Sequence, residues 1–153
     1  MTATNHTLTG SVFALVLAPV LPWWVIIPVA FCLHFVLDSL PHFGQRDNQL
    51  AAITRLKWFL PIDATFGAVV LLVLLLVRPE YWLLAMASGI ACASPDLWSA
   101  SRFFRFLRTG DPSRNKDWFS RFHSSIQWGE RLWGAWIELA WVGVFSYVLI
   151  TKL

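Results

Sequence analysis

The segment His34-x3-Asp38-x3-His42 places two histidines and an aspartate at intervals of four residues. Residues four apart lie on one face of a helix, so His34 and Asp38 are expected to point the same way. His42 directly follows Pro41 and is expected to fold back toward them. Neutral imidazole and carboxylate suit zinc, manganese or iron, so this spacing predicts a metal site. The alternative is a His–Asp pair that only locks two helices together.

Four further side chains of the same chemistry stand near the ends of apolar segments: His6, Asp63, Asp96 and His123. A cluster that mixes histidines with several carboxylates also suits a site with two metal ions. Simpler roles exist for each of them. Asp63 complements a helix dipole, Asp96 caps a helix, and the two histidines are ordinary interfacial residues. We keep all four as candidate metal ligands, and Asp63 and Asp96 also as candidate general bases.

The elements that carry these residues are strongly apolar. Of the 153 residues, 57% are hydrophobic and 14% are charged, whereas a soluble domain has about 45–50% and about 25%. A soluble fold this small is unable to bury so much apolar surface. The composition therefore excludes a disordered chain and a disulfide-rich secreted module, and it predicts a polytopic integral membrane protein.

Prolines and polar breaks divide the apolar sequence into helices. The prolines at 19 and 22 predict a tight turn between helices over 6–18 and 23–40, and the segment 78–80 predicts a second turn. We expect a single all-α domain, a bundle of about five membrane helices. Its parts are a hairpin over 6–40, a hairpin over 60–100, an amphipathic cytoplasmic segment over 102–130 and a last span over 131–151.

Closing the two hairpins brings the polar residues to one end of the bundle. The first hairpin places His6 level with His34 and Asp38, and the second places Asp63 level with Asp96. The link between the hairpins stays on one side of the membrane, so both groups face the same side. The segment that precedes the last span returns there as well. The topology therefore predicts one pocket that gathers distant imidazoles and carboxylates.

Basic residues indicate the orientation of the bundle. Of the twelve Lys and Arg, only Arg78 and Lys152 fall on the side opposite the polar cluster, which leaves ten on the cluster's side. Such a bias marks the cytoplasmic side, so the N-terminus and the cluster are predicted to be cytoplasmic. The Arg-rich stretch there contacts lipid headgroups, or it holds a substrate phosphate through Arg102, Arg105 and Arg121. No groove-reading motif is present, so no nucleic-acid partner is expected.

Two segments resemble a known family of small inner-membrane proteins, the LexA-regulated membrane-bound metal-dependent hydrolases. These segments are Asn5–Gly10 (NHTLTG) and His34–Phe43 (HFVLDSLPHF). Members of that family open with a histidine-containing segment before a helix, and they carry an Asp/His pattern after the second helix. The family places a His-Arg-Gly-x-Thr-His-Ser segment later in the chain, and the nearest counterpart here is His123-Ser124-Ser125.

The resemblance implies a helical membrane protein whose metal ligands include His6, Asp38 and His42. Together with the residue pattern, it predicts a membrane-embedded hydrolase of the prokaryotic inner membrane, using one or two zinc or manganese ions. The expected substrate is an amphipathic phosphoester, such as a phospholipid or a polyprenyl phosphate. Ser39 and Ser124 lie near candidate histidines, so a serine hydrolase stays open, although no G-x-S-x-G motif is present. The competing class is non-enzymatic: a small membrane scaffold or a metal-ion handling protein.

Overall fold

The chain folds into a bundle of helices. The computed structural model describes residues 1–44, 49–109 and 117–153, and over 49–57, 99–107 and at 109 it describes the backbone alone. Within this part of the chain the α-helices are α1 (Ala3–Leu17), α2 (Trp23–Ser39), α3 (Gln49–Val77), α4 (Trp82–Thr109), α5 (Trp118–Ile126) and α6 (Gly134–Lys152). The all-α class predicted from the sequence is therefore confirmed.

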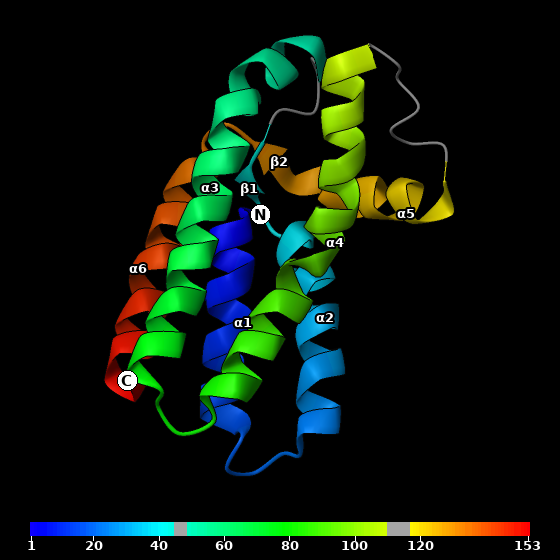
Figure 1. The fold of residues 1–153 in the computed structure, drawn as a ribbon. Helices are drawn as coiled ribbons and strands as arrows, with labels where there is room; N and C mark the ends of the chain where they lie inside the picture. Colours follow the sequence, from blue (N-terminus) through cyan, green and yellow to red (C-terminus); the bar gives the residue numbers. More distant parts are fainter. Residues whose placement is uncertain (45–48, 110–116) are drawn as a thin grey trace.

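Helix α1 runs through the middle of the bundle, between α3 and α6 on one side and α4 and α2 on the other (Figure 1). Most of its side chains are buried, including polar ones such as His6 and Ser11. Small residues let α4 come close, because a Cβ placed on Gly10 would lie 2.4 Å from the carbonyl oxygen of Ser88. Small residues at the contact are what allow two helix backbones to approach this closely.

The observed helices differ from the predicted ones mainly at the site end of the second hairpin. The first hairpin has α1 and α2 close to the predicted ranges 6–18 and 23–40. Helix α3, in contrast, begins at Gln49 instead of near residue 60. Helix α4 runs through Pro95 and past residue 100, where the second hairpin is predicted to end, as far as Thr109.

Local hydrogen bonding explains why Pro95 does not end α4. A proline inside a helix lacks the N–H that would bond to the carbonyl four residues earlier. That carbonyl belongs to Ala91, and the hydroxyl of Ser94 donates a hydrogen bond to it at 2.8 Å. Pro95 is itself fully buried. Burial of the ring and the replacement hydrogen bond compensate for the missing one.

Two short strands join distant parts of the chain at the site end. Strands β1 (His42–Phe43) and β2 (Glu130–Arg131) pair in parallel, with His42 opposite Glu130. Helix α6 comes so close to β1 that a Cβ on Gly134 would lie 2.2 Å from the carbonyl carbon of His42. Since only the 3-10 helix η2 (Gln127–Gly129) separates α5 from β2, this pairing limits where α5 can lie.

The outward faces of α3 and α6 are apolar. Among the described residues, the segments Trp58–Val77 and Gly134–Lys152 are long and apolar enough to cross a membrane, and only 17% of each is buried. These two helices are compatible with membrane insertion, against about five spans predicted. Helices α1 and α2 have 15 and 17 residues and so cover about 22 and 25 Å, less than a hydrocarbon core of about 30 Å.

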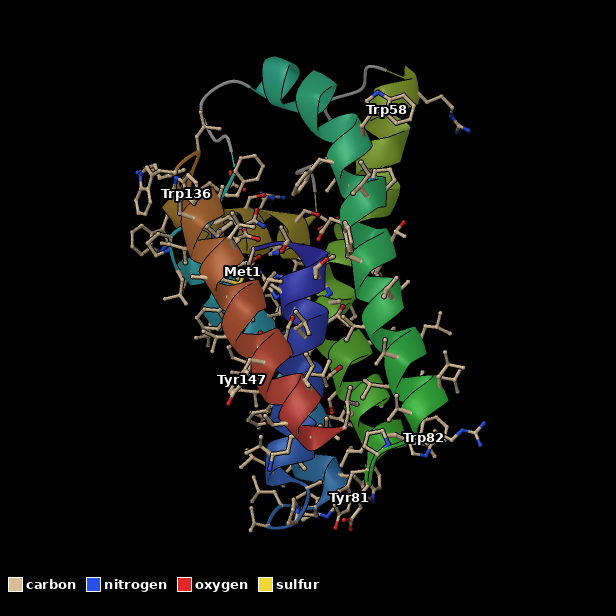
Figure 2. The ribbon with its side chains drawn as sticks, turned by 90° about the vertical axis from the view of Figure 1, so that its left-hand side faces the viewer. Met1, Trp58, Tyr81, Trp82, Trp136 and Tyr147 are labelled. Atoms are coloured by element: carbon tan, nitrogen blue, oxygen red, sulfur yellow. The ribbon has the colours of Figure 1, made fainter. Side chains whose placement is uncertain are left out.

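Aromatic side chains lie toward both ends of the bundle. Figure 2 shows Trp58 and Trp136 toward one end, Tyr81 and Trp82 at the other, and Tyr147 between them. Trp58 and Trp136 are strongly exposed. Apart from Tyr147, these Trp and Tyr side chains lie at two levels, which is the arrangement found at the two interfaces of a bilayer.

Candidate metal centre

Helix α2 supplies the first two side chains of the site. His34 and Asp38 lie one turn apart on α2, and both are fully buried. The helix ends directly after them, because Leu40 takes an extended conformation before Pro41 (φ −77°, ψ 158°). A carboxylate in the last turn of a helix faces the negative end of the helix dipole. Asp38 therefore needs a cationic partner from elsewhere in the fold.

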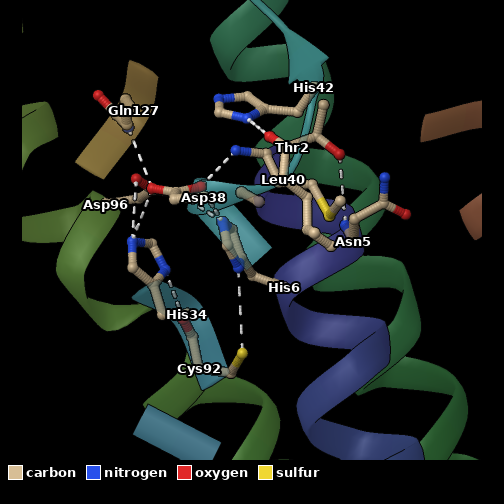
Figure 3. A network of polar contacts seen from close by, with 12 residues as sticks. Thr2, Asn5, His6, His34, Asp38, Leu40, His42, Cys92, Asp96 and Gln127 are labelled. Atoms are coloured by element: carbon tan, nitrogen blue, oxygen red, sulfur yellow. Dashed lines mark hydrogen bonds and ion pairs between the residues drawn. The ribbon is translucent and has the colours of Figure 1, made fainter. Parts of the chain in front are cut away.

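Three other helices bring side chains to Asp38 (Figure 3). From α1, Nε2 of His6 lies 3.1 Å from Oδ1 of Asp38, and from α5, Nε2 of His123 lies 2.8 Å from Oδ2. From α4 comes Asp96, whose carboxylate oxygens lie 3.7 to 3.8 Å from the Nε2 atoms of His6, His34 and His123. The side chain of Asp96 is 29% exposed, whereas that of His123 is 5% exposed.

Four of these side chains have the spacing of a single metal site. Nε2 of His34, Nε2 of His123 and Oδ2 of Asp38 lie 2.8 to 3.2 Å from one another. Oδ1 of Asp96 lies 3.8 Å from both nitrogens, and all four ligand atoms fall within 4.8 Å. Ligands about 2.0–2.1 Å from a tetrahedral zinc ion stand about 3.3 Å apart. The observed separations bracket that value, so the cluster could hold a metal ion.

The protonation of His34 supports a cation at this position. Its Nδ1 lies 2.8 Å from the carbonyl oxygen of Cys92, which only accepts, so Nδ1 carries the hydrogen. In the neutral ring Nε2 then offers a lone pair. That lone pair faces a carboxylate oxygen of Asp38 and the Nε2 atom of His123. An imidazole oriented by a backbone carbonyl through its second nitrogen is the usual arrangement of a metal-bound histidine.

Further polar groups surround the same carboxylate. The amide of Gln127 donates a hydrogen bond to Oδ2 of Asp38 at 3.1 Å, and the amino group of Met1 contacts Oδ1. The rings of His6 and His34 are stacked, with their centroids 4.0 Å apart. Gln127 is not among the residues predicted from the sequence. Its position four residues after His123, which places both on one face of α5 and its C-terminal end, is the signal that could have found it.

His42 does not fold back into this group as the sequence predicts. After Pro41 the chain enters β1, and Nδ1 of His42 donates to the carbonyl of Leu40 at 2.8 Å. Burial lowers the pKa of His42, and the nearby amino group of Met1 lowers it further. His42 is thus a buried neutral histidine beside the centre, held by its own loop and by the pairing of β1.

Asp63 faces the first turn of α1. Its carboxylate accepts hydrogen bonds from the backbone N–H groups of Ala3 (2.6 Å) and Thr4 (3.1 Å), and from the Thr4 hydroxyl (2.6 Å). The first N–H groups of a helix have no partner within the helix, and they attract negative charge. Asp63 therefore complements a helix dipole as the sequence analysis allows, but the dipole is that of α1 and not of its own helix.

Glu138 of α6 holds the same end of α1. Its buried carboxylate accepts from the N–H of Thr2 (3.0 Å), the amide of Asn5 (3.1 Å) and the N–H of Phe43 in β1 (3.0 Å). One side chain thus links the start of α1, which leads to His6, to the strand that follows α2. Glu138 fixes the two segments that flank the centre.

The predicted phosphate-binding arginines lie on the helices that carry Asp96 and His123. Arg121 is an exposed residue of α5. Arg102 and Arg105 belong to α4, but their side chains lie outside the described part of the chain. For Arg102 and Arg105 the structure therefore shows only which helix carries them, and for Arg121 it also shows an exposed side chain.

Comparison with known proteins gives no relative of this chain. No protein-family model matches it, and neither a curated protein nor a solved structure is significantly similar to it.

Proposed function

We propose that this protein is a membrane-embedded metal-dependent hydrolase that acts on an amphipathic phosphoester, with zinc or manganese as the metal. The observation that carries the proposal is the convergence of His34, Asp38, Asp96 and His123, from three helices, on one point at metal-ligand spacing. The amino group of Met1 supplies one positive charge beside the two carboxylates, so a further cation would stabilise the cluster. The resemblance to the LexA-regulated hydrolases supports the same activity.

A divalent ion in such a site activates water and polarises a phosphoryl oxygen. Asp96 is the most exposed member of the group, so water and substrate are proposed to approach from its side. In the reaction a water oxygen bonds to phosphorus, the ester P–O bond breaks, and the leaving oxygen takes up a proton. Because Asp96 would be a ligand, the proton that the attacking water loses passes to solvent on the exposed side of the centre. Asp63, also a candidate base in the sequence, is engaged with α1 instead.

The surface beside Asp96 supports an amphipathic substrate. Leu97 and Trp98 follow it on α4 and are 62% and 58% exposed. The ring of Trp98 contacts Phe119 of α5, with the centroids 6.1 Å apart, and Phe122 on the same short helix is also exposed. An apolar shelf thus borders the open side of the polar centre. We propose that it receives the acyl or isoprenoid part of the substrate while the phosphate reaches the centre.

The arginines provide the complementary charge. We propose that Arg121 of α5, with Arg102 and Arg105 of α4, neutralises the substrate phosphate, as guanidinium groups do well. They lie on the two helices that contribute His123 and Asp96. Because the arginines and the ligands share α4 and α5, this placement supports a role for the arginines beside the centre.

We propose that about five helices of the bundle lie in the membrane, with the centre at the cytoplasmic face of a prokaryotic inner membrane. The apolar outward faces of α3 and α6 and the aromatic residues toward both ends support this placement. The excess of Lys and Arg on the site's side supports the orientation. The short helices α1 and α2 require that the bilayer thins locally or that their ends lie below the headgroups.

Full burial of His34 and Asp38 favours a second candidate, a metal site that only holds the helices together. One experiment separates the two functions. The protein is purified in detergent without chelator, its metal content is measured, and it is incubated with vesicles containing phosphatidic acid or a polyprenyl phosphate. We expect bound metal and release of inorganic phosphate. Bound metal with no phosphate release from either lipid would favour the scaffold.

Two variants test the site itself. The double variant His34→Gln, Asp38→Asn is expected to lose the metal and all phosphate release. His42→Gln, which alters a buried histidine outside the group, is the matched control and is expected to keep both. Full metal content in a folded double variant would reject the site.

A further inference from the structure

We propose that the centre holds a second divalent cation, with His6 as its histidine ligand and with Asp38 and Asp96 bridging the two ions. This inference rests on the proposed function, because a bridging carboxylate needs an ion on each side. The side chains that would hold the second ion come from α1, α2 and α4, whereas α5 contributes only to the first.

In each of the two carboxylates, one oxygen lies near His34 and His123 and the other lies near His6. Oδ2 of Asp38 lies 3.2 Å from Nε2 of His34 and 2.8 Å from that of His123, while Oδ1 lies 3.1 Å from Nε2 of His6. Oδ1 of Asp96 lies 3.8 Å from the same two nitrogens, while Oδ2 lies 3.7 Å from that of His6. Bridging carboxylates are shared in this manner by ions about 3.5–4 Å apart.

His6 is prepared as a ligand. It is fully buried, and its ring is stacked on His34 at 4.0 Å. Its Nδ1 lies 4.0 Å from Sγ of Cys92, a weak partner. As a ligand, His6 would carry its ring hydrogen on Nδ1, so that Nε2 directs its lone pair toward the two carboxylates. The amino group of Met1 contacts the same Oδ1 of Asp38, so the second ion would displace this amino group from that oxygen.

The charge of the centre agrees with two ions and an anionic substrate. Two carboxylates, three imidazoles that are neutral as metal ligands, and the cationic amino group of Met1 carry one net negative charge. Two divalent ions leave the centre positive by three charges. A doubly charged phosphomonoester compensates more of this charge than a singly charged diester, which favours a monoester as the substrate.

The competing interpretation gives His6 only a hydrogen bond that orients Asp38. Titration with Mn²⁺ separates the two. The protein in detergent is stripped with a chelator, titrated with Mn²⁺, and examined for bound ions per chain and by electron paramagnetic resonance. We expect two ions per chain and the spectrum of an exchange-coupled pair, for the wild type and for the control His42→Gln. For His6→Gln we expect one ion per chain and the spectrum of isolated Mn²⁺.

The outcomes distinguish this proposal from the function on which it rests. One ion per chain in the wild type overturns the second site and leaves the first in place. Two bound ions without exchange coupling would also overturn the second site, because the second ion would then lie away from the centre. No bound ion overturns both proposals. If His6→Gln fails to fold, the stoichiometry and spectrum of the wild type decide alone.

Discussion

Removing the carboxylate of Asp63 is expected to destabilise the fold without removing the metal. Three donors at the start of α1 bond to this side chain, two backbone N–H groups and the hydroxyl of Thr4. A hydrogen bond contributes about 0.5–1.5 kcal/mol net, so three together contribute up to about 4 kcal/mol. Asp63→Ala should therefore lower the free energy of unfolding by about 4 kcal/mol, and Asp63→Asn, which keeps one acceptor oxygen, by about 2 kcal/mol.

These energies convert to thermal shifts that can be measured in detergent. For a chain of this size 1 kcal/mol shifts the Tm by about 2–4 °C, so we expect losses of about 8–16 °C for Asp63→Ala and about 4–8 °C for Asp63→Asn. Thr65→Ala is the control, because this exposed threonine of the same helix bonds only to the carbonyl of Pro61. Its Tm should change little.

Metal content decides what the carboxylate does. If Asp63 only caps α1, the folded Asp63→Asn protein keeps its metal below its lowered Tm. Loss of metal from Asp63→Asn at a Tm equal to that of Thr65→Ala would refute the capping argument. That result would make Asp63 a metal ligand, as the sequence alone allows.

Three further outcomes are expected. Glu138→Ala removes the acceptor of three donors and should lower the free energy of unfolding by about 3–4 kcal/mol, measured by thermal denaturation, with metal retained in the folded fraction. Gly134→Ala should lower the Tm, since its Cβ would meet the backbone of His42 at 2.2 Å, whereas Gly143→Ala, with nothing within 4 Å, should not. Burial lowers the pKa of His42, so unfolding of the chelator-treated protein takes up a proton at low pH. Its free energy of unfolding should therefore fall as the pH drops below about 6.5. In His42→Gln, denaturation measured at several pH values should show a weaker fall over this range.

The sequence predicts the depth of the polar residues well. A hairpin of two helices with a turn at a known place fixes which residues lie level, because each residue rises about 1.5 Å along the helix. This places His6 beside Asp38, and their side chains lie 3.1 Å apart. His34 and Asp38 share a face simply because they are four residues apart.

The closure of a hairpin does not determine how each helix is rotated about its axis, and so it does not determine which way a side chain points. Asp63 is predicted to join Asp96, yet its carboxylate turns toward the start of α1, because the packing of α3 against α1 decides which face it presents. His42 leaves the group because the chain pairs as β1 after Pro41, with a partner strand almost ninety residues away. The carbonyl of Cys92 is likewise invisible in a sequence, since a backbone group has no residue type.

The buried charge of the centre and the position of α5 depend on one another. With nine residues, α5 is too short to be stable alone. On one side Phe119 and Phe122 contact Phe35 of α2, with centroids 6.3 and 5.4 Å apart. On the other side His123 reaches Asp38. The amino group of Met1 offsets one of the two carboxylate charges that α2 and α4 bring to the centre. A metal ion at the centre would offset the other, join both carboxylates to His123 and so hold α5 across the site. The side chain that completes the centre therefore comes from the helix that most needs the ion to stay in place.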